Sequence, residues 1–217
     1  MAALTLSDEQ KHHYETFGFL HLPQMLSEAE VQALRDELAA VHAARYRSPL
    51  GELNPRELEP MLRQKTPFAA SLPEDDRFGG VAEQLQGPSL LCAVNSYNFT
   101  GNTSWHPDFE RAGEFGQCDS MVMAVYLDAP GLDGDSGALR VVPSSHVDPL
   151  HSAIFEETEK TAVPFGFVKQ TDWPCHICAC GPHDILIFNA HLWHASLGGS
   201  TFTRNQPAAC ASSFLCF

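Results

Sequence analysis

The sequence predicts a mainly β domain, folded as a sandwich or barrel-like jelly roll, with helices packed on its outside. Short apolar or alternating runs recur from residue 90 onward, separated by clusters of Gly, Pro, Asp and Asn, the pattern of many short strands joined by turns. The clear helix-start signals come earlier. A chain of 217 residues fits one domain. We therefore predict a single domain over residues 1–217, with a mostly helical and loop part over 1–88 and a jelly-roll core over 89–217.

Two capping boxes define the N-terminal helices. Ser7–Gln10 predicts a short helix ending near Gly18, because Ser and a Gln three residues later satisfy free N–H groups at a helix start. Phe19–Leu22 is then a short strand, closed by Pro23. Ser27–Glu30 predicts a second, more regular helix with one apolar stripe. The stripe consists of Val31, Leu34, Leu38 and Val41.

Residues 46–88 carry repeated prolines, which break any long element. We expect short helices between loops in this part and assign no chemistry to it. The strands expected after residue 90 are short runs bounded by turn residues. They are Leu91–Val94, Met121–Leu127, Ala138–Val142, Phe165–Val168, Ile177–Cys180, Ile185–Phe188 and Cys210–Phe217.

The net charge and the cysteine content limit the classes of partner and the cellular compartment that we expect for this protein. The formal net charge of −14 argues against nucleic acid or an anionic membrane surface as a partner. No apolar run reaches transmembrane length, and the N-terminus lacks a basic stretch followed by an apolar core. We expect a cytoplasmic protein. Its seven cysteines form no even, spaced framework, so reduced thiols are expected.

The stretch Trp105–Glu110 contains a candidate metal site. On an extended backbone, residues two apart point the same way, so His106 and Asp108 can hold one cation from one side. A third ligand must come from elsewhere, and His194 is the best candidate. Two imidazoles and one carboxylate with open positions opposite them form the ligand set of non-haem Fe(II) oxygenases.

Other residues compete for these roles. His191 is three residues from His194 and would face the other way on a strand, so at most one of them should reach the metal; we favour His194. Cys175, Cys178 and Cys180 form one cluster without the second pair that a structural zinc site needs, so buried free thiols are favoured over zinc. His146 is expected in a supporting turn. The histidines expected at the surface are His12, His13, His42, His151 and His183.

Several segments, in order, resemble the phytanoyl-CoA dioxygenase family of Fe(II)/2-oxoglutarate-dependent oxygenases. They are Leu6–Leu20, Leu26–Val31, Trp105–Asp108, Asp135–His146, and Asp184–Ser196 followed by Arg204. The segment Asp135–His146 is similar to a signature that ends in Val-Pro-Gly-Ser-His, with Ser144 in place of Gly. The resemblance implies a double-stranded β-helix of the cupin-like type that uses Fe(II), 2-oxoglutarate and O2.

The resemblance also implies residue roles. His106, Asp108 and His194 would bind Fe(II). Arg204 would pair with the distal carboxylate of 2-oxoglutarate, since a guanidinium matches a carboxylate bidentately. Ser196 would hydrogen-bond the same cosubstrate, and Asn98 would meet it with its amide. The His194-to-Arg204 gap is one residue shorter than in better-known members.

The expected reaction is hydroxylation of a C–H bond of a small-molecule substrate, with succinate and CO2 as coproducts. A carboxylate at Asp108 favours hydroxylation, or a related desaturation, over halogenation, because related halogenases have Ala or Gly there. The run Trp105–Glu110 resembles the ectoine hydroxylase branch, without defining the substrate. Two alternatives stay open: a non-catalytic jelly-roll binding protein, and a cupin-type metal-dependent hydrolase or isomerase that does not use 2-oxoglutarate. The oligomeric state is not predicted.

Overall fold

The structure is a computed structural model that describes residues 4–45, 56–60, 64–88, 94–99, 103–108, 120–127, 138–161 and 173–196. Its α-helices are α1 (Asp8–Phe17), α2 (Glu28–Arg45), α3 (Val81–Gln86) and α4 (Leu150–Thr161), with a 3-10 turn η1 (Ala69–Glu74) and a π turn η2 (Asp76–Gly80). Its strands are β1 (Phe19–Leu22), β2 (Arg56–Pro60), β3 (Asn95–Phe99), β4 (Thr103–His106), β5 (Met121–Ala124), β6 (Leu139–Val141), β7 (His176–Cys178), β8 (Ile185–Asn189) and β9 (His194–Ser196).

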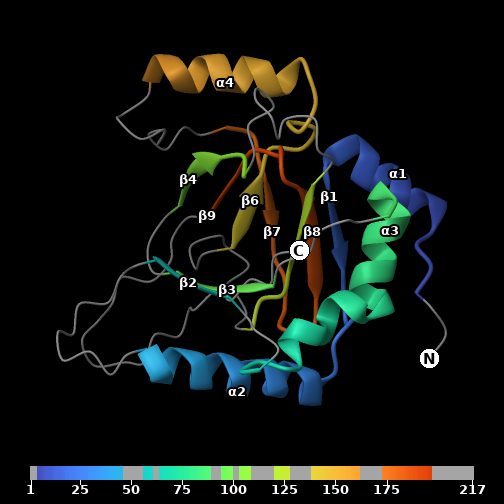
Figure 1. Ribbon diagram of the computed structural model, residues 1–217. Helices are drawn as coiled ribbons and strands as arrows, with labels where there is room; N and C mark the ends of the chain where they lie inside the picture. Colours follow the sequence, from blue (N-terminus) through green and yellow to red (C-terminus); the bar gives the residue numbers. More distant parts are fainter. Residues whose placement is uncertain are drawn as a thin grey trace.

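Two antiparallel sheets pack face to face (Figure 1). One has the strand order β1-β8-β5 and the other β4-β9-β6-β7, while β2 and β3 form a separate pair. Side chains from both sheets form one buried cluster between them. Its members are Phe19, Val122, Ala124, Tyr126, Leu139, Val141, Cys178, Cys180, Leu186, Phe188 and Leu192. The mainly β fold class is confirmed.

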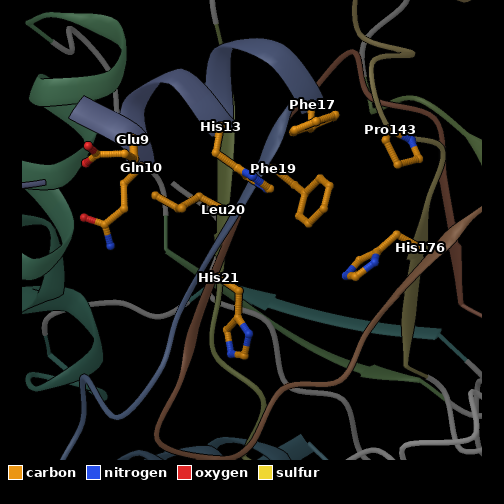
Figure 2. Close-up of a pocket in the computed structure, with 9 residues that line it drawn as sticks. All are labelled: Glu9, Gln10, His13, Phe17, Phe19, Leu20, His21, Pro143 and His176. Atoms are coloured by element: carbon orange, nitrogen blue, oxygen red, sulfur yellow. The ribbon is translucent and has the colours of Figure 1, made fainter. Parts of the chain in front are cut away.

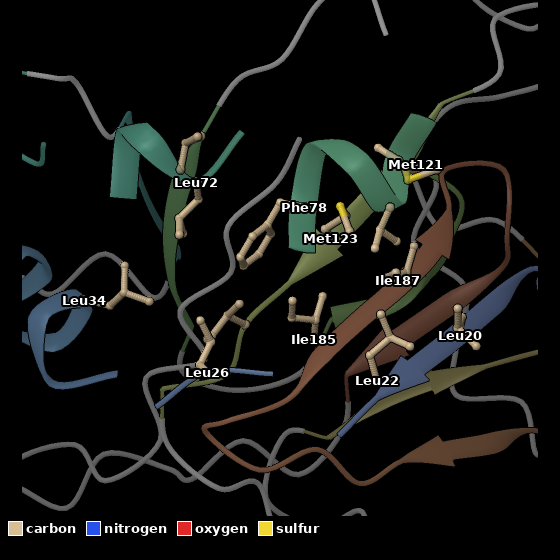
Figure 3. Packing of buried hydrophobic residues seen from close by; sticks show 14 of the residues in the cluster. Leu20, Leu22, Leu26, Leu34, Leu72, Phe78, Met121, Met123, Ile185 and Ile187 are labelled. Atoms are coloured by element: carbon tan, nitrogen blue, oxygen red, sulfur yellow. The ribbon is translucent and has the colours of Figure 1, made fainter. Parts of the chain in front are cut away.

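Strand β8 is buried on both faces, because each face packs against a different layer. Ile185 and Ile187 point to the cluster shared with the N-terminal helices, which Figure 3 shows. Leu186 and Phe188 point to the opposite sheet. Side chains alternate across a strand, so a strand covered on both sides is apolar throughout.

Helices cover both outer faces of this sandwich. Helices α1, α2 and α3 all pack into the cluster on the outer side of the three-stranded sheet, as expected for the N-terminal part. Figure 1 shows α1 and α3 beside β1, and α2 across the lower end of the molecule. Helix α4, which we did not predict, covers the outside of the four-stranded sheet. Its Ile154 packs against Trp105 and Trp193.

The local signals at the N-terminus are confirmed. Ser7 Oγ accepts from the Gln10 backbone N–H at 3.2 Å, and the Gln10 side chain accepts from the Ser7 N–H at 2.9 Å. Glu30 and Ser27 form the same reciprocal pair at the start of α2. Helix α1 ends at Gly18, and β1 coincides with the predicted strand.

The prediction for residues 46–88 is only partly right. Short helical turns do occupy 69–86, but β2 is a strand where we expected helices and loops. It pairs with β3. Of the predicted strand Leu91–Val94, only Val94 lies within the described residues, and it precedes β3. The segment Arg56–Pro60 has little apolar alternation, so its partner strand decides its conformation. The predicted strands Phe165–Val168 and Cys210–Phe217 lie outside the described residues.

Within the described ranges, no helix has the length and apolar character needed to cross a lipid bilayer.

Gly18 links α1 to β1 and lies close to His146 and Leu192. Its φ of 80° is in the left-handed region, where a side chain costs about 1 kcal/mol or more. A Cβ at this position would also lie 2.5 Å from Nδ1 of His146 and 2.8 Å from Cδ1 of Leu192. Glycine is therefore required by both conformation and packing.

We predict that Gly18→Ala lowers the free energy of unfolding by about 2–4 kcal/mol, combining the backbone cost with overpacking. Urea denaturation monitored by circular dichroism measures the change. Gly18→Asn is the matched control, because Asn tolerates the left-handed conformation but still carries a Cβ. A stability of Gly18→Asn equal to that of the wild type would show that the contact with His146 is unimportant.

Candidate metal centre

His106, Asp108 and His194 come together at one end of the four-stranded sheet. His106 ends β4, Asp108 lies two residues later in a bend, and His194 begins β9. Asp108 Oδ1 is 3.9 Å from Nε2 of His106 and 3.7 Å from Nε2 of His194. The imidazole centroids are 4.4 Å apart. Among the described residues, this is the only group of three or more His, Cys, Asp or Glu placed to share a metal ion.

A β-bulge creates this arrangement. Thr103 pairs with Ser196, but His106 rather than Trp105 pairs with His194, so β4 uses one more residue than β9 over the same distance. A bulge redirects the side chains that follow it. It places His106 directly opposite His194, where cross-strand side chains meet. We expected His106 and Asp108 to share an extended backbone. Instead the strand ends at His106, and a bend at Asp108 brings its carboxylate back toward the two imidazoles.

Both imidazoles are oriented by backbone carbonyls. Nδ1 of His106 is 2.6 Å from Ser104 O, and Nδ1 of His194 is 2.9 Å from Leu192 O. A carbonyl oxygen only accepts, so Nδ1 carries the hydrogen in each ring. In the neutral imidazole, each Nε2 then presents a lone pair. These are the two nitrogens nearest Asp108, and this is how metal-ligating histidines are usually held.

The donor set fits a divalent metal ion. Divalent transition ions bind imidazole and carboxylate groups at about 2.0–2.2 Å, so ligand atoms on one ion lie roughly 3–4 Å apart. The separations of 3.7 and 3.9 Å meet this condition. The His194 side chain is 7% exposed, whereas those of His106 and Asp108 are 42% and 36% exposed. The group is thus anchored in the core at one ligand and open to further ligands at the others.

The structure describes the remaining predicted site residues to different extents. Ser196 follows His194 on the same strand face, is buried, and donates its backbone N–H to Thr103 Oγ1 at 2.7 Å. Asn98 belongs to β3, which is described only as backbone. Arg204 lies outside the described residues. Their contacts with a cosubstrate remain predictions.

The residues beside the ligands support the fold. Trp105 and Trp193 point to the outer face, where they pack with Ile154 of α4, so they belong to the core rather than to a pocket wall. Trp173 bridges them, with ring centroids 5.5 Å from Trp105 and 5.9 Å from Trp193. Phe188 approaches His194 from the inner face, at 4.9 Å between centroids.

Four predictions about histidines can be compared with their burial and hydrogen bonds. His191 is buried in the turn before β9 and does not belong to the ligand group, which agrees with our choice of His194. His146 supports a turn as expected, with Nε2 3.2 Å from Glu15 O. The prediction that His151 is exposed is wrong, because the unpredicted helix α4 buries it against the β8–β9 turn. His183 is also partly buried, with Nδ1 2.9 Å from Leu26 O.

A separate cavity of about 610 Å³ lies beside α1, β1 and β7 (Figure 2). Phe19 stacks on His176, with centroids 5.0 Å apart, and His13 meets Phe19 edge-on. Burial lowers the pKa of His176 below its usual value, and His13 and His21 add to this effect. These three imidazoles do not converge on a common point as the ligand group does. The cavity shares no residue with the candidate metal centre.

Cys178 and Cys180 are buried free thiols in the cluster between the sheets. Burial raises the pKa of both thiols, to about 12 for Cys180. Together with Cys175 they form no group placed for a metal ion among the described residues. The prediction of buried free thiols is confirmed for Cys178 and Cys180.

We predict that iodoacetamide labels Cys175 at least about tenfold faster than Cys178 or Cys180 in the native protein at pH 8. The thiolate is the reactive species, and a buried thiol with a raised pKa is rarely ionised. Peptide mass spectrometry of timed samples measures the three rates. Equal labelling rates in the native protein would contradict the burial of Cys178 and Cys180. Equal rates after denaturation are expected and would not contradict it.

The fold and the ligand group define a class of protein: two packed antiparallel sheets that carry two histidines and a carboxylate at one end. Solved structures share this fold. HygX from Streptomyces hygroscopicus, with nickel and 2-oxoglutarate bound, has a TM-score of 0.70 and 20% identity, covering 98% of this chain and 85% of its own. The non-haem α-ketoglutarate-dependent carbocyclase SnoK from nogalamycin biosynthesis has a TM-score of 0.67 and 18% identity, covering 100% and 83%.

A third similar structure is EvdO2 from Micromonospora carbonacea var. aurantiaca complexed with 2-oxoglutarate, with a TM-score of 0.63 and 17% identity, covering 91% of this chain and 86% of its own. Comparison with curated protein sequences finds no match. The phytanoyl-CoA dioxygenase (PhyH) family profile matches residues 14–205. The chain belongs to the phytanoyl-CoA dioxygenase family. This confirms the expected class, a non-haem iron dioxygenase that uses 2-oxoglutarate and O2.

Proposed function

We propose that His106, Asp108 and His194 hold Fe(II) in this enzyme, and that it hydroxylates a C–H bond of a small molecule. The observation that supports the proposal is the convergence of two carbonyl-oriented imidazoles and one carboxylate within 4.8 Å of one another. When bound, the iron couples oxidative decarboxylation of 2-oxoglutarate by O2 to oxidation of the substrate, with succinate and CO2 as coproducts.

The residues of the chain supply binding and orientation. The two Nε2 atoms and the Asp108 carboxylate would hold the metal ion. His194 is rigidly placed between Phe188 and the Leu192 carbonyl, whereas His106 and Asp108 border solvent. In this proposal Arg204 pairs with the distal carboxylate of 2-oxoglutarate, while Ser196 and Asn98 hydrogen-bond the cosubstrate.

Asp108 favours hydroxylation as the outcome, because its carboxylate occupies the ligand position that related halogenases leave open. The α-ketoglutarate-dependent proteins SnoN and SnoK are an epimerase and a carbocyclase, so proteins of this fold direct the same cosubstrate to other outcomes. Desaturation is the second outcome that fits an intact ligand group.

A small-molecule substrate is supported by the HygX structure that contains hygromycin B. The resemblance of Trp105–Glu110 to ectoine hydroxylases does not extend this to a particular compound. Trp105 packs under α4, away from the ligands, so this part of the resemblance concerns packing. The cytoplasmic location and the absence of nucleic-acid and membrane partners remain predictions of the sequence.

We predict that His106→Ala, Asp108→Ala and His194→Ala each weaken Fe(II) binding at least about 100-fold, since two remaining ligands rarely hold a catalytic metal. Anaerobic titration with Fe(II) and 2-oxoglutarate, monitored by the weak visible charge-transfer band, measures binding. The control is His12→Ala, whose side chain is 82% exposed and lies in α1. Full binding by the three variants would exclude this metal site, and succinate formation in the wild type would exclude a non-catalytic binding protein.

We predict that Arg204→Met raises the 2-oxoglutarate concentration needed for half-maximal succinate formation at least about tenfold, with Fe(II) affinity unchanged. Loss of a charged bidentate partner costs roughly 1.5–3 kcal/mol. Arg204→Lys keeps the charge but loses the fork, so an intermediate value is expected. Turnover without 2-oxoglutarate would favour the cupin-type hydrolase or isomerase. An unchanged 2-oxoglutarate requirement in Arg204→Met would mean that the cosubstrate site lies elsewhere.

A further inference from the structure

His151 occupies an unusual position for a residue in the first turn of a surface helix. It is 4% exposed, and its Nδ1 lies 3.0 Å from Ser145 O and 3.1 Å from His191 O. Both neighbours are carbonyl oxygens, which only accept, so Nδ1 carries a hydrogen shared between them. The ring therefore joins two backbone segments that are distant in sequence.

Both segments hold the strand that begins with His194. On one side, Ser145 Oγ accepts from the Trp193 N–H at 2.9 Å. Val142, three residues earlier, donates its N–H to Trp193 O at 2.9 Å. The residue immediately before the buried metal ligand is thus bonded at both its N–H and its C=O.

On the other side, His191 O lies in the turn between β8 and β9. The next residue, Leu192, donates its N–H to Asn189 O at 2.8 Å. Its own carbonyl accepts from Nδ1 of His194 at 2.9 Å. A displacement of the His191–Leu192 peptide would therefore rotate the carbonyl that orients the ligand imidazole.

We infer that His151 is a positioning residue for the metal centre: its Nδ1–H fixes the His191 carbonyl, and through Leu192 it sets the orientation of the His194 ring. His151 is not itself one of the three candidate ligands. This inference rests on the proposed metal-binding function. It assigns to α4 a role in the site that its place on the outer face of the sheet does not suggest.

A role in packing alone would place a different requirement on the side chain at position 151. The His151 ring also packs against Trp193, with centroids 6.0 Å apart, and meets His191 edge-on at 6.4 Å. If the ring only fills space, any side chain of similar volume will serve. If it positions His194, the donor at Nδ1 is required, and side chains can be chosen to separate the two demands.

The experiment compares three variants. The amide nitrogen of Asn lies near the position of Nδ1 and that of Gln near Nε2, while Phe keeps an aromatic ring without a donor. We expect His151→Gln and His151→Phe to bind Co(II) about 10–100-fold more weakly than the wild type, the usual cost of losing an outer hydrogen-bond partner of a metal site. His151→Asn should stay within about threefold. Isothermal titration calorimetry with Co(II) gives the Kd values, and the visible Co(II) absorption spectrum should change in the Gln and Phe variants only.

The matched control is His183→Gln, which removes a comparable Nδ1 donor to a backbone carbonyl, that of Leu26, at 2.9 Å. This bond ties the turn before β8 to the segment that precedes α2 rather than to β9, so Co(II) affinity should be unchanged. Thermal unfolding of the metal-free proteins compares their stabilities. Equal stability loss in His151→Gln and His183→Gln, with weaker Co(II) binding only in the former, supports positioning.

Other results overturn the inference. Wild-type Co(II) affinity in His151→Gln and His151→Phe would show that the donor is not needed. Equal weakening in the Asn and Gln variants, or a failure of His151→Asn to fold, would show a packing role only. If the wild-type protein does not bind Co(II), or if His106→Ala binds it as tightly as the wild type, the proposed metal centre itself is rejected. These results differ from a failure confined to His151, in which Co(II) binding still depends on His106.

Discussion

The pairing of β4 with β9 is the constraint on which the site depends. Its bulge puts His106 opposite His194, and a regular ladder would have put Trp105 there instead. A shift of one residue moves every side chain to the other face. The same bulge sends Trp105 to the outer face, where it packs with Trp193 under α4. The positions of the proposed metal ligands and of the tryptophans that support them are thus two consequences of one register.

The layered packing makes this register rigid. The sheet that carries the ligands faces the other sheet on its inner side and α4 on its outer side. Phe188 of the opposite sheet contacts the His194 ring from within. Protein interiors are close-packed, so the buried His194 is confined from both sides. The more exposed His106 and Asp108 leave the other side of the site accessible.

The segment Val141–His146, which resembles a family signature, serves mainly to hold the site together. Ser145 Oγ bonds the Trp193 N–H, and His146 lies against Gly18 at the end of α1. Ser144 has a φ of 66°, a conformation that favours glycine and explains why glycine is usual in the signature. Its hydroxyl donates to Thr16 O at 2.8 Å, which offsets part of the backbone cost.

The sequence by itself determined the features that depend on a few neighbouring residues: both capping boxes, the end of α1 at Gly18, strand β1, and the identity of His106, Asp108 and His194 as candidate ligands. Only the tertiary structure decided the bulge, the pairing of β2 with β3, the helix α4 and the burial of His151. The physical reason is range. A cap or a turn is satisfied within about four residues, whereas a strand register or a buried imidazole depends on partners that the chain brings together from 40 or more residues away, such as His151 and His191.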